Sequence, residues 1–495
     1  MIKVIAKREL LDQVSSPKFI FLFLVSALLL VFSLYTGSAA YVSARDELHA
    51  TDQLSRREIE NRANYQELAQ FGVKVGRAPS PLSAVAAGVS SALGRSARVT
   101  PGQQPDIAPP PLADQPVVAV LGELDLSVVI RVFLSLFVLL LTYDTIAGEK
   151  ETGTLKAVLA NPVPRTRLLL GKALGLFGTF FAATAIPAVL GLLVMQLGFH
   201  IELSGAEWMR LLCIGAVAGL YLLALFSMGL FVSTATTRSS VAFLVLLLLL
   251  VSFTEIIPKA SPMLARQFRP VPAYAELQSE RDRLQRENQQ ANFKAMSAAF
   301  SLMQAPVNSE AEANARQLKI DSIVSRARDS LSRDLREQQT RLDESYRNRQ
   351  DAMTGLALAI ARLSPAAAMS HAVEVMAGTD FDLHRRWRGE LIGYRSALED
   401  WFKAKGVEFG GGARFAIRIN QTTSTRNGAS QTLRIGGPSS DDAKLDLSTM
   451  PAFKPQAEPL SAAMSRAAPD MMILGLWSVA MLMLAFWKFL KYDVR

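Results

Sequence analysis

The sequence predicts an all-α polytopic membrane protein with six transmembrane helices and a mostly helical extracytoplasmic domain that contains a small β element. Half of the 495 residues are hydrophobic, and the mean hydropathy is +0.21, which is unusual for a soluble protein of this size. The apolar residues gather in runs that approach the about 20 residues that a helix needs to cross a bilayer. Two long polar regions separate groups of these runs, which predicts two large insertions outside the membrane.

The first apolar run covers residues 19–36 and follows a polar, basic leader, so residues 1–36 are expected to form the N-terminus and the first span. A cleaved secretory signal peptide is the alternative, because small residues suited to cleavage follow at 38–40. The leader is long, however, and it carries Glu9 and Asp12. A retained helix is therefore the favoured interpretation.

The remaining apolar runs predict five more spans. Four of them lie within residues 124–257 and one within 471–495, and the runs themselves cover 124–143, 169–198, 209–233, 240–257 and 471–487. Six spans place both termini on the same side of the membrane. Lysine and arginine gather at both termini and in the polar segment 146–168, so the positive-inside rule predicts that these parts are cytoplasmic.

The first outward insertion is expected to cover residues 37–123. Within it, residues 43–71 have the pattern of a charged helix. The proline-rich run 101–116 is expected to be extended and weakly structured.

The second outward insertion is expected to cover residues 258–470, with long helices at 272–302 and 315–356 and a small hairpin at 414–435, where apolar and polar residues alternate. The second helix has an eleven-residue repeat, which predicts a nearly straight or slightly right-handed apolar seam. The repeat positions are Ile320, Leu331, Leu342 and Met353. Such a helix packs against 272–302 as a projecting hairpin or stalk, or it covers a globular domain, because periodicity fixes the apolar face but not its partner.

The segment 146–168 is the strongest candidate for function. Pro162 and Pro164 cannot lie inside a continuing helix, which predicts a short helix over Lys150–Ala160. Its apolar edge (Leu155, Val158 and Leu159) could insert into a groove on a partner and pass motion to the adjoining spans. An ordinary amphipathic loop has the same pattern, so periodicity leaves both interpretations open.

Several classes of site are not supported by the sequence. The single cysteine, Cys213, and four scattered histidines offer no metal site and no disulfide framework. A phosphate-binding loop requires a lysine after the second glycine, but Thr154 follows Gly153, so this chain is not expected to hydrolyse ATP. We find no nucleophile elbow or zinc-protease motif, so no enzyme is predicted. Basic residues without interleaved aromatics do not indicate nucleic-acid binding.

The order of residues in this segment resembles that of ABC-2-type transporter permeases, in particular six-span members with large extracytoplasmic insertions. The resemblance rests on an acidic residue, Gly-Thr-Leu, Pro-x-x-Arg and Gly-Lys: Glu149 or Glu151, Gly153-Thr154-Leu155, Pro162 to Arg165, and Gly171-Lys172. Three further matches are Leu363-Ser364-Pro365 with Ala377-Gly378-Thr379 and the helix His384–Lys403, then Met450-Pro451-Ala452-Phe453, and the tail Phe489–Arg495. Nothing aligns over 37–123 and 285–360.

The resemblance implies a permease subunit of the bacterial cytoplasmic (inner) membrane that works with a separate ABC ATP-binding subunit. That subunit would bind ATP and Mg²⁺, while this chain would need no cofactor. Further implied partners are a second permease protomer, identical or related, the lipid bilayer and a possible periplasmic protein. The implied coupling residues are Glu149, Glu151, Gly153, Thr154, Leu155, Leu159, Pro162, Arg165 and Lys172. A protein that passes ATPase-driven motion to an outer partner without transporting a substrate is the alternative, and the residues identify no substrate site.

Overall fold

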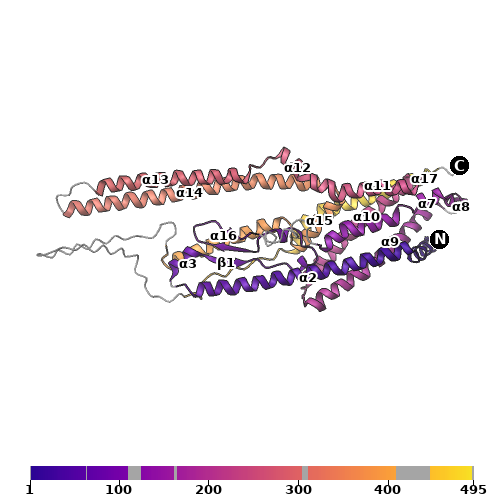
Figure 1. Ribbon diagram of the computed structural model, residues 1–495, viewed down its shortest axis with the longest axis horizontal. Helices are drawn as coiled ribbons and strands as arrows, with labels where there is room; N and C mark the ends of the chain where they lie inside the picture. The colour runs from indigo at the N-terminus through magenta and orange to yellow at the C-terminus, as the bar shows by residue number, and fades with distance from the viewer. Residues whose placement is uncertain are drawn as a thin grey trace.

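A computed structural model describes residues 2–62, 64–109, 124–160, 164–303, 310–407 and 446–492. Within these ranges, six helices are long and apolar enough to cross a membrane. The membrane helices gather near both termini at one end of an elongated molecule, and a long helical hairpin and a small sheet lie toward the other end (Figure 1). The predicted fold class, a largely helical membrane protein with six spans and a small β element, is confirmed.

The six spans cover the predicted apolar runs, except residues 124 and 125, and most extend well beyond them. They are Pro17–Glu60, Leu126–Glu151, Arg165–Gly198, Gly205–Ala235, Ser239–Phe268 and Leu460–Leu490. The corresponding helices are α2 (Pro17–Glu60), α5 (Leu126–Val128), α6 (Ser135–Thr142), α7 (Ala147–Glu151), α9 (Arg165–Leu193), α10 (Gly205–Ala235), α11 (Ser239–Val251), α12 (Ile257–Phe268) and α17 (Leu460–Leu490). π-helical turns interrupt three spans, at Val129–Leu134, Val194–Gly198 and Ser252–Ile256. A short helix, α1 (Ile2–Val14), precedes α2 and packs along α9.

The first span is one continuous helix of 44 residues, about 66 Å long and twice the thickness of a bilayer core. It begins after Ser16, whose hydroxyl accepts a hydrogen bond from the Phe19 amide, and it joins the membrane run to part of the charged region predicted as a separate helix at 43–71. That prediction is corrected: α2 ends at Glu60, and a second helix, α3 (Tyr65–Phe71), follows. Gly37 does not break α2 but allows a close approach, because a Cβ there would lie 2.0 Å from the Ala84 carbonyl oxygen.

The β element lies in the first insertion. Strands β1 (Val73–Gly76), β2 (Ser96–Val99) and β3 (Asp106–Ile107) form an antiparallel sheet in the order β1-β2-β3. Helix α16 (Asp382–Ala404) packs its apolar face against the sheet, and the shared core includes Val73, Val75, Ala97, Val99, Trp387, Leu391 and Leu398. The expectation of weak structure from residue 101 is thus wrong for the part that forms β3. The predicted hairpin at 414–435 lies outside the described residues.

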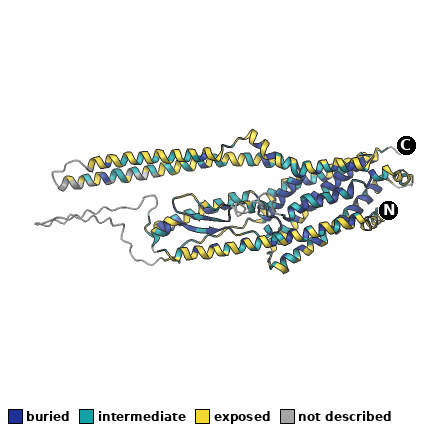
Figure 2. Ribbon diagram, viewed as in Figure 1, coloured by how far each residue is buried: buried dark blue, intermediate teal, exposed yellow. Residues whose placement is uncertain are grey.

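Helices α13 (Tyr274–Met303) and α14 (Glu310–Ala361) form an antiparallel hairpin that extends farther from the membrane helices than the sheet does (Figure 1). The hairpin is exposed over much of its surface (Figure 2). All four positions of the eleven-residue repeat are buried or half-buried, as expected for the seam between two helices. Within the seam, Arg281 forms an ion pair with the buried carboxylate of Asp343 at 2.5 Å. The hairpin has the form of a stalk rather than of a cover over a globular domain.

A buried ion-pair cluster joins the base of the stalk to the last span. The Asp470 carboxylate on α17 is fully buried, and it accepts two hydrogen bonds from Arg362, at 2.7 and 3.1 Å. His371 on α15 (Pro365–Ala377) lies 2.7 Å from the same carboxylate. We call Arg362, His371 and Asp470 the ionic clasp. One turn away on α17, Arg466 pairs with Asp380, Asp382 and Glu458, so the N-terminal part of α17 is fixed by two sets of charges.

Replacing Gly37 by alanine should destabilise the protein, because the added methyl group would collide with a backbone carbonyl that cannot move without shifting its turn. We expect a loss of about 1–3 kcal/mol, measured as a lower midpoint of chemical unfolding in detergent micelles. Gly178→Ala is the matched control, because a Cβ there meets nothing within 4 Å. Equal midpoints for the two variants would show that α2 does not pack on the Ala84 turn as described.

Arg362→Gln should destabilise the protein by about 3 kcal/mol, because it removes the guanidinium that pairs with the buried Asp470 carboxylate and leaves that carboxylate with His371 as its remaining contact. Arg283→Gln on the exposed side of α13 is the control. Its pairs with Glu280 and Glu287 are exposed, and their loss should cost less than about 1 kcal/mol. The same unfolding assay measures both, and an Arg362 variant as stable as the Arg283 variant contradicts the buried clasp.

Candidate functional site

The segment between the second and third spans folds into two short helices rather than one. Helix α7 ends at Glu151, and α8 (Thr154–Leu159) begins after Gly153. Gly153 has a φ of +74°, a left-handed conformation that glycine adopts without steric cost. The prediction of a single helix over Lys150–Ala160 is therefore corrected to a pair of helices with a sharp turn at Gly153. Pro162 lies outside the described residues.

The apolar edge of α8 faces the chain itself. Leu155 is 0% exposed and belongs to an apolar cluster with Ile146, Leu168, Leu169 and Phe489. Val158 and Leu159 pack against the same cluster and are half-buried. The expectation that Leu155 enters a groove on a partner is thus wrong, because its side chain holds α8 against the ends of α7, α9 and α17.

Two charged residues of the predicted site neutralise each other. Lys172, on α9, is only 7% exposed, and its ammonium lies 2.7 Å from a Glu149 carboxylate oxygen and 3.4 Å from one of Glu9 on α1. A buried ammonium is costly unless it is paired. These contacts tie α1, α7 and α9 together, so neither Glu149 nor Lys172 is available for strong charge contacts with a partner.

Three more residues of the segment bind the ends of other spans. The Lys150 ammonium donates to the carbonyl oxygens of Thr234 and Thr236 at the end of α10. The Glu151 carboxylate accepts hydrogen bonds from the amide and hydroxyl of Ser239, the first residue of α11. Arg165 donates to the carbonyl oxygens of Leu490 and Tyr492 at the end of α17, at 2.8 and 2.9 Å.

The segment thus contacts the ends of α1, α9, α10, α11 and α17, while one of its surfaces stays exposed. Exposed residues are Thr152, Gly153, Thr154, Lys156 and Ala157. The Thr152 and Thr154 hydroxyls lie 3.0 Å apart, within hydrogen-bond distance. We call these five residues the exposed turn. Of the residues predicted for coupling, Gly153 and Thr154 lie on it, and exposed Glu151 lies at its edge.

Sequence reasoning missed Ser233, a residue of α10 that caps the start of α7. The Ser233 hydroxyl, on α10, accepts hydrogen bonds from the backbone amides of Ile146 and Ala147, both at 3.0 Å, and donates to the Tyr143 carbonyl oxygen. This serine supplies from another helix the acceptor that an N-cap side chain normally provides. A lone serine near the end of an apolar run carries no signal of that role.

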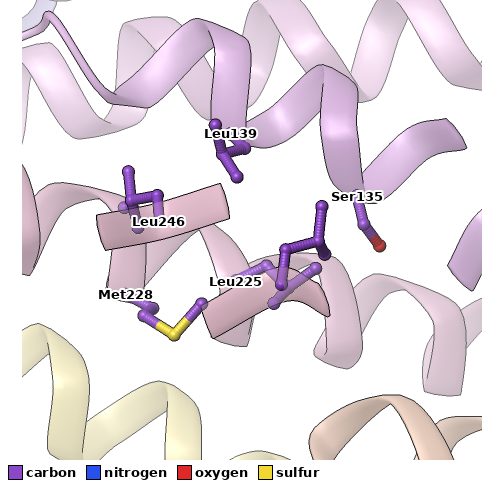
Figure 3. A pocket seen from close by; sticks show the side chains of 7 residues that line it. Ser135, Leu139, Leu225, Met228 and Leu246 are labelled. Carbon is purple, nitrogen blue, oxygen red and sulfur yellow. The ribbon is translucent and has the colours of Figure 1, made fainter. Parts of the chain in front are cut away.

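The membrane part contains a small pocket between α6, α10 and α11 (Figure 3). It has room for about one water molecule, about 10 Å³, and it is lined by Ser135, Leu139, Leu225, Met228, Gly229, Leu246 and Leu250. The Ser135 hydroxyl already lies 2.7 Å from that of Tyr221. This pocket is too small and too apolar to hold a polar substrate. Among the described residues, no group of three or more histidine, cysteine, aspartate or glutamate side chains could hold a metal ion.

In this geometry, one short segment touches the ends of five helices. No curated protein matches the chain. The sequence model of the family described as "ABC-2 family transporter protein", however, matches residues 3–494. This match covers both insertions as well as all six spans, and it confirms the resemblance based on the segment around Gly153. The chain therefore belongs to the ABC-2 family of transporter membrane proteins.

Proposed function

We propose that this chain is the permease subunit of an ABC transporter of the bacterial inner membrane, with both termini in the cytoplasm, and that the exposed turn receives force from a separate ATP-binding subunit. ATP and Mg²⁺ would be bound by that partner. One observation supports the proposal most strongly: the segment contacts the ends of α1, α9, α10, α11 and α17 through hydrogen bonds, ion pairs and the Leu155 cluster, while the exposed turn faces solvent.

The contacts explain how a small displacement would spread. Leu155 and its apolar cluster make α8 move with α9 and α17, and the bonds of Lys150 and Glu151 make α7 move with α10 and α11. Packed interiors transmit such displacements because they have few voids to absorb them. A partner that pushes the exposed turn would thus tilt several spans together. A second permease protomer would supply the other wall of any transport path.

Thr154→Trp should weaken association with the ATP-binding subunit, because it places a large ring on the exposed turn. We expect a loss of about 1.4 kcal/mol of binding free energy, which is about a tenfold loss of affinity. The unfolding midpoint should not change, because Thr154 is exposed. The measurement is co-purification of the permease with its partner ATPase, followed by binding of that ATPase to the permease in nanodiscs. Thr340→Trp, the same change at an exposed site on the stalk, is the control.

Unlike Thr154→Trp, Leu155→Asp should affect folding as well as ATPase binding. Leu155 is buried in its own chain, so the aspartate should lower the unfolding midpoint as well as ATPase binding. If Thr154→Trp binds the ATPase as the parent does, or if a Thr154→Cys variant in a Cys213→Ser background is labelled from outside the cell, the proposed role of the exposed turn is wrong.

One observation favours the second function, in which motion passes outward without transport. Helix α17 is held at one end by Arg165 and the Leu155 cluster, and at the other by the ionic clasp at the base of the stalk. A helix of 31 residues fixed at both ends acts as a rod between the exposed turn and the stalk. In this function the stalk would move against a periplasmic partner.

The two functions differ in whether the ionic clasp must transmit motion from α17 to the stalk. Spin labels at Thr340→Cys on the stalk and Ser204→Cys before α10, in the Cys213→Ser background, report the stalk's position relative to the spans. If motion is transmitted through α17, adding ATP to the complex should shift this distance in the parent but not in Asp470→Asn, while ATPase binding is kept. An unchanged distance in the parent would contradict transmission to the stalk and favour transport.

A further inference from the structure

Three buried hydrogen-bond donors lie without acceptors between the sheet and the start of α16. They are Nη1 of Arg77, Nδ1 of His384 and Nε1 of Trp387, none of which has a hydrogen-bond partner among the described residues. Arg77 is 8% exposed and Trp387 is 2% exposed. Native proteins leave few buried polar groups unpaired, and each one calls for an explanation. We call Arg77, His384 and Trp387 the donor corner.

The three residues of the donor corner also lie close together. The Arg77 guanidinium carbon lies 5.6 Å from the centre of the Trp387 ring, and His384 is on the preceding turn of the same helix. Strand β1 fixes Arg77: its backbone amide donates to the Arg95 carbonyl oxygen at 2.7 Å, and its Nη2 donates to that of Ser90 at 2.9 Å. Nη2 of the guanidinium is thus hydrogen-bonded, whereas Nη1 can still donate.

The protonation of His384 follows from its other partner. Nη2 of Arg388 lies 2.8 Å from Nε2 of His384. A guanidinium can only donate, so Nε2 accepts and the ring proton must be on Nδ1. Burial, together with the charges of Arg388, Arg77 and Arg347, lowers the pKa of His384 to about 4, so the ring is neutral at neutral pH. Its Nδ1–H is therefore a third donor without an acceptor.

The charge around the donor corner is positive. Burial and the charge of Arg95 lower the pKa of Arg77 to about 10, still well above neutral pH. Three acids of the neighbouring elements pair with other arginines: Asp343 with Arg281, Asp351 with Arg385 and Glu47 with Arg95. Within the described part of the chain, no carboxylate lies within ion-pair distance of Arg77 or Arg388. A buried cation of this kind is stabilised by an anion.

We propose that the donor corner binds an anionic oxygen group, a carboxylate or a phosphate, from a small ligand that enters between β1 and α16. Such a group has several lone pairs, enough to accept from all three donors, and its charge would offset that of Arg77. A single water molecule has two lone pairs and no charge, so it would leave one donor unpaired. The inference does not depend on coupling to an ATPase.

The test uses the full chain in nanodiscs, with ¹⁵N in tryptophan and histidine and with inorganic phosphate and acetate as separate probes. The chain has five tryptophans and four histidines, so Trp387→Phe and His384→Gln assign the two signals. Either probe should shift both signals in a saturable way and raise the pKa of His384 from about 4, because a bound anion offsets the surrounding cations. Arg77→Gln should weaken binding about tenfold or more, since it removes a charged donor.

Two variants separate binding from folding. Arg98→Gln, at a half-buried arginine of the same sheet, should bind the probe as the parent does, and Arg77→Lys should restore part of the affinity lost in Arg77→Gln. Anionic lipid in place of neutral lipid identifies the source: a shift without added probe indicates a headgroup, and a shift with the soluble probe alone indicates a free ligand. If neither signal responds to phosphate, acetate or anionic lipid, or if Arg77→Gln responds as the parent does, the corner holds only water and the proposal is wrong.

Discussion

The burial of Leu155 is the packing contact on which the architecture of this end of the spans depends. A leucine that leaves water fully contributes about 1.5–3 kcal/mol, and here its partners come from α7, α9 and α17. Without this contact α8 would be a helix of six residues, far too short to be stable alone. Tertiary packing therefore decides both that α8 forms and where it lies. The left-handed Gly153 then allows α8 to turn back toward the spans instead of continuing α7.

The polar contacts of the segment have a different role from the apolar ones. Lys172 is paired with two carboxylates, and removing it would leave Glu149 and Glu9 facing each other in a partly buried site. Buried ion pairs contribute little net stability but fix one arrangement, because every alternative leaves a charge unpaired. Apolar packing around Leu155 holds α8 close, and these charges set its orientation. Together they make the segment and the span ends one rigid unit.

Much of the membrane part could be predicted because its cause is local. Twenty apolar residues form a helix in a bilayer whatever surrounds them, since every backbone group must be satisfied within the segment, and all six spans lie on the predicted runs. The eleven-residue repeat likewise marks the seam of α14. The sheet was not predicted, because strands of four residues or fewer, such as Val73–Gly76, depend on a covering helix that lies some 300 positions away along the chain. The direction of Leu155 was mistaken for the same reason, since periodicity identifies an apolar edge but not what covers it.

Two groups of charged and polar side chains, the ionic clasp and the donor corner, differ in whether the described chain supplies their partners. In the ionic clasp, Asp470 meets Arg362 and His371, and one turn away Arg466 meets three carboxylates, so the described chain supplies a partner for each of these charges. A set of this kind needs nothing from outside and serves to hold α14, α15 and α17 together. At the donor corner, Arg77, His384 and Trp387 offer hydrogens with no acceptor, although acidic side chains lie close by on α14. Folding could have satisfied these donors with one of those carboxylates, and the carboxylates instead pair with other arginines. The described chain pairs the charges of the ionic clasp but leaves the donors of the donor corner unpaired. Such buried, unpaired donors are expected where a ligand brings the acceptor.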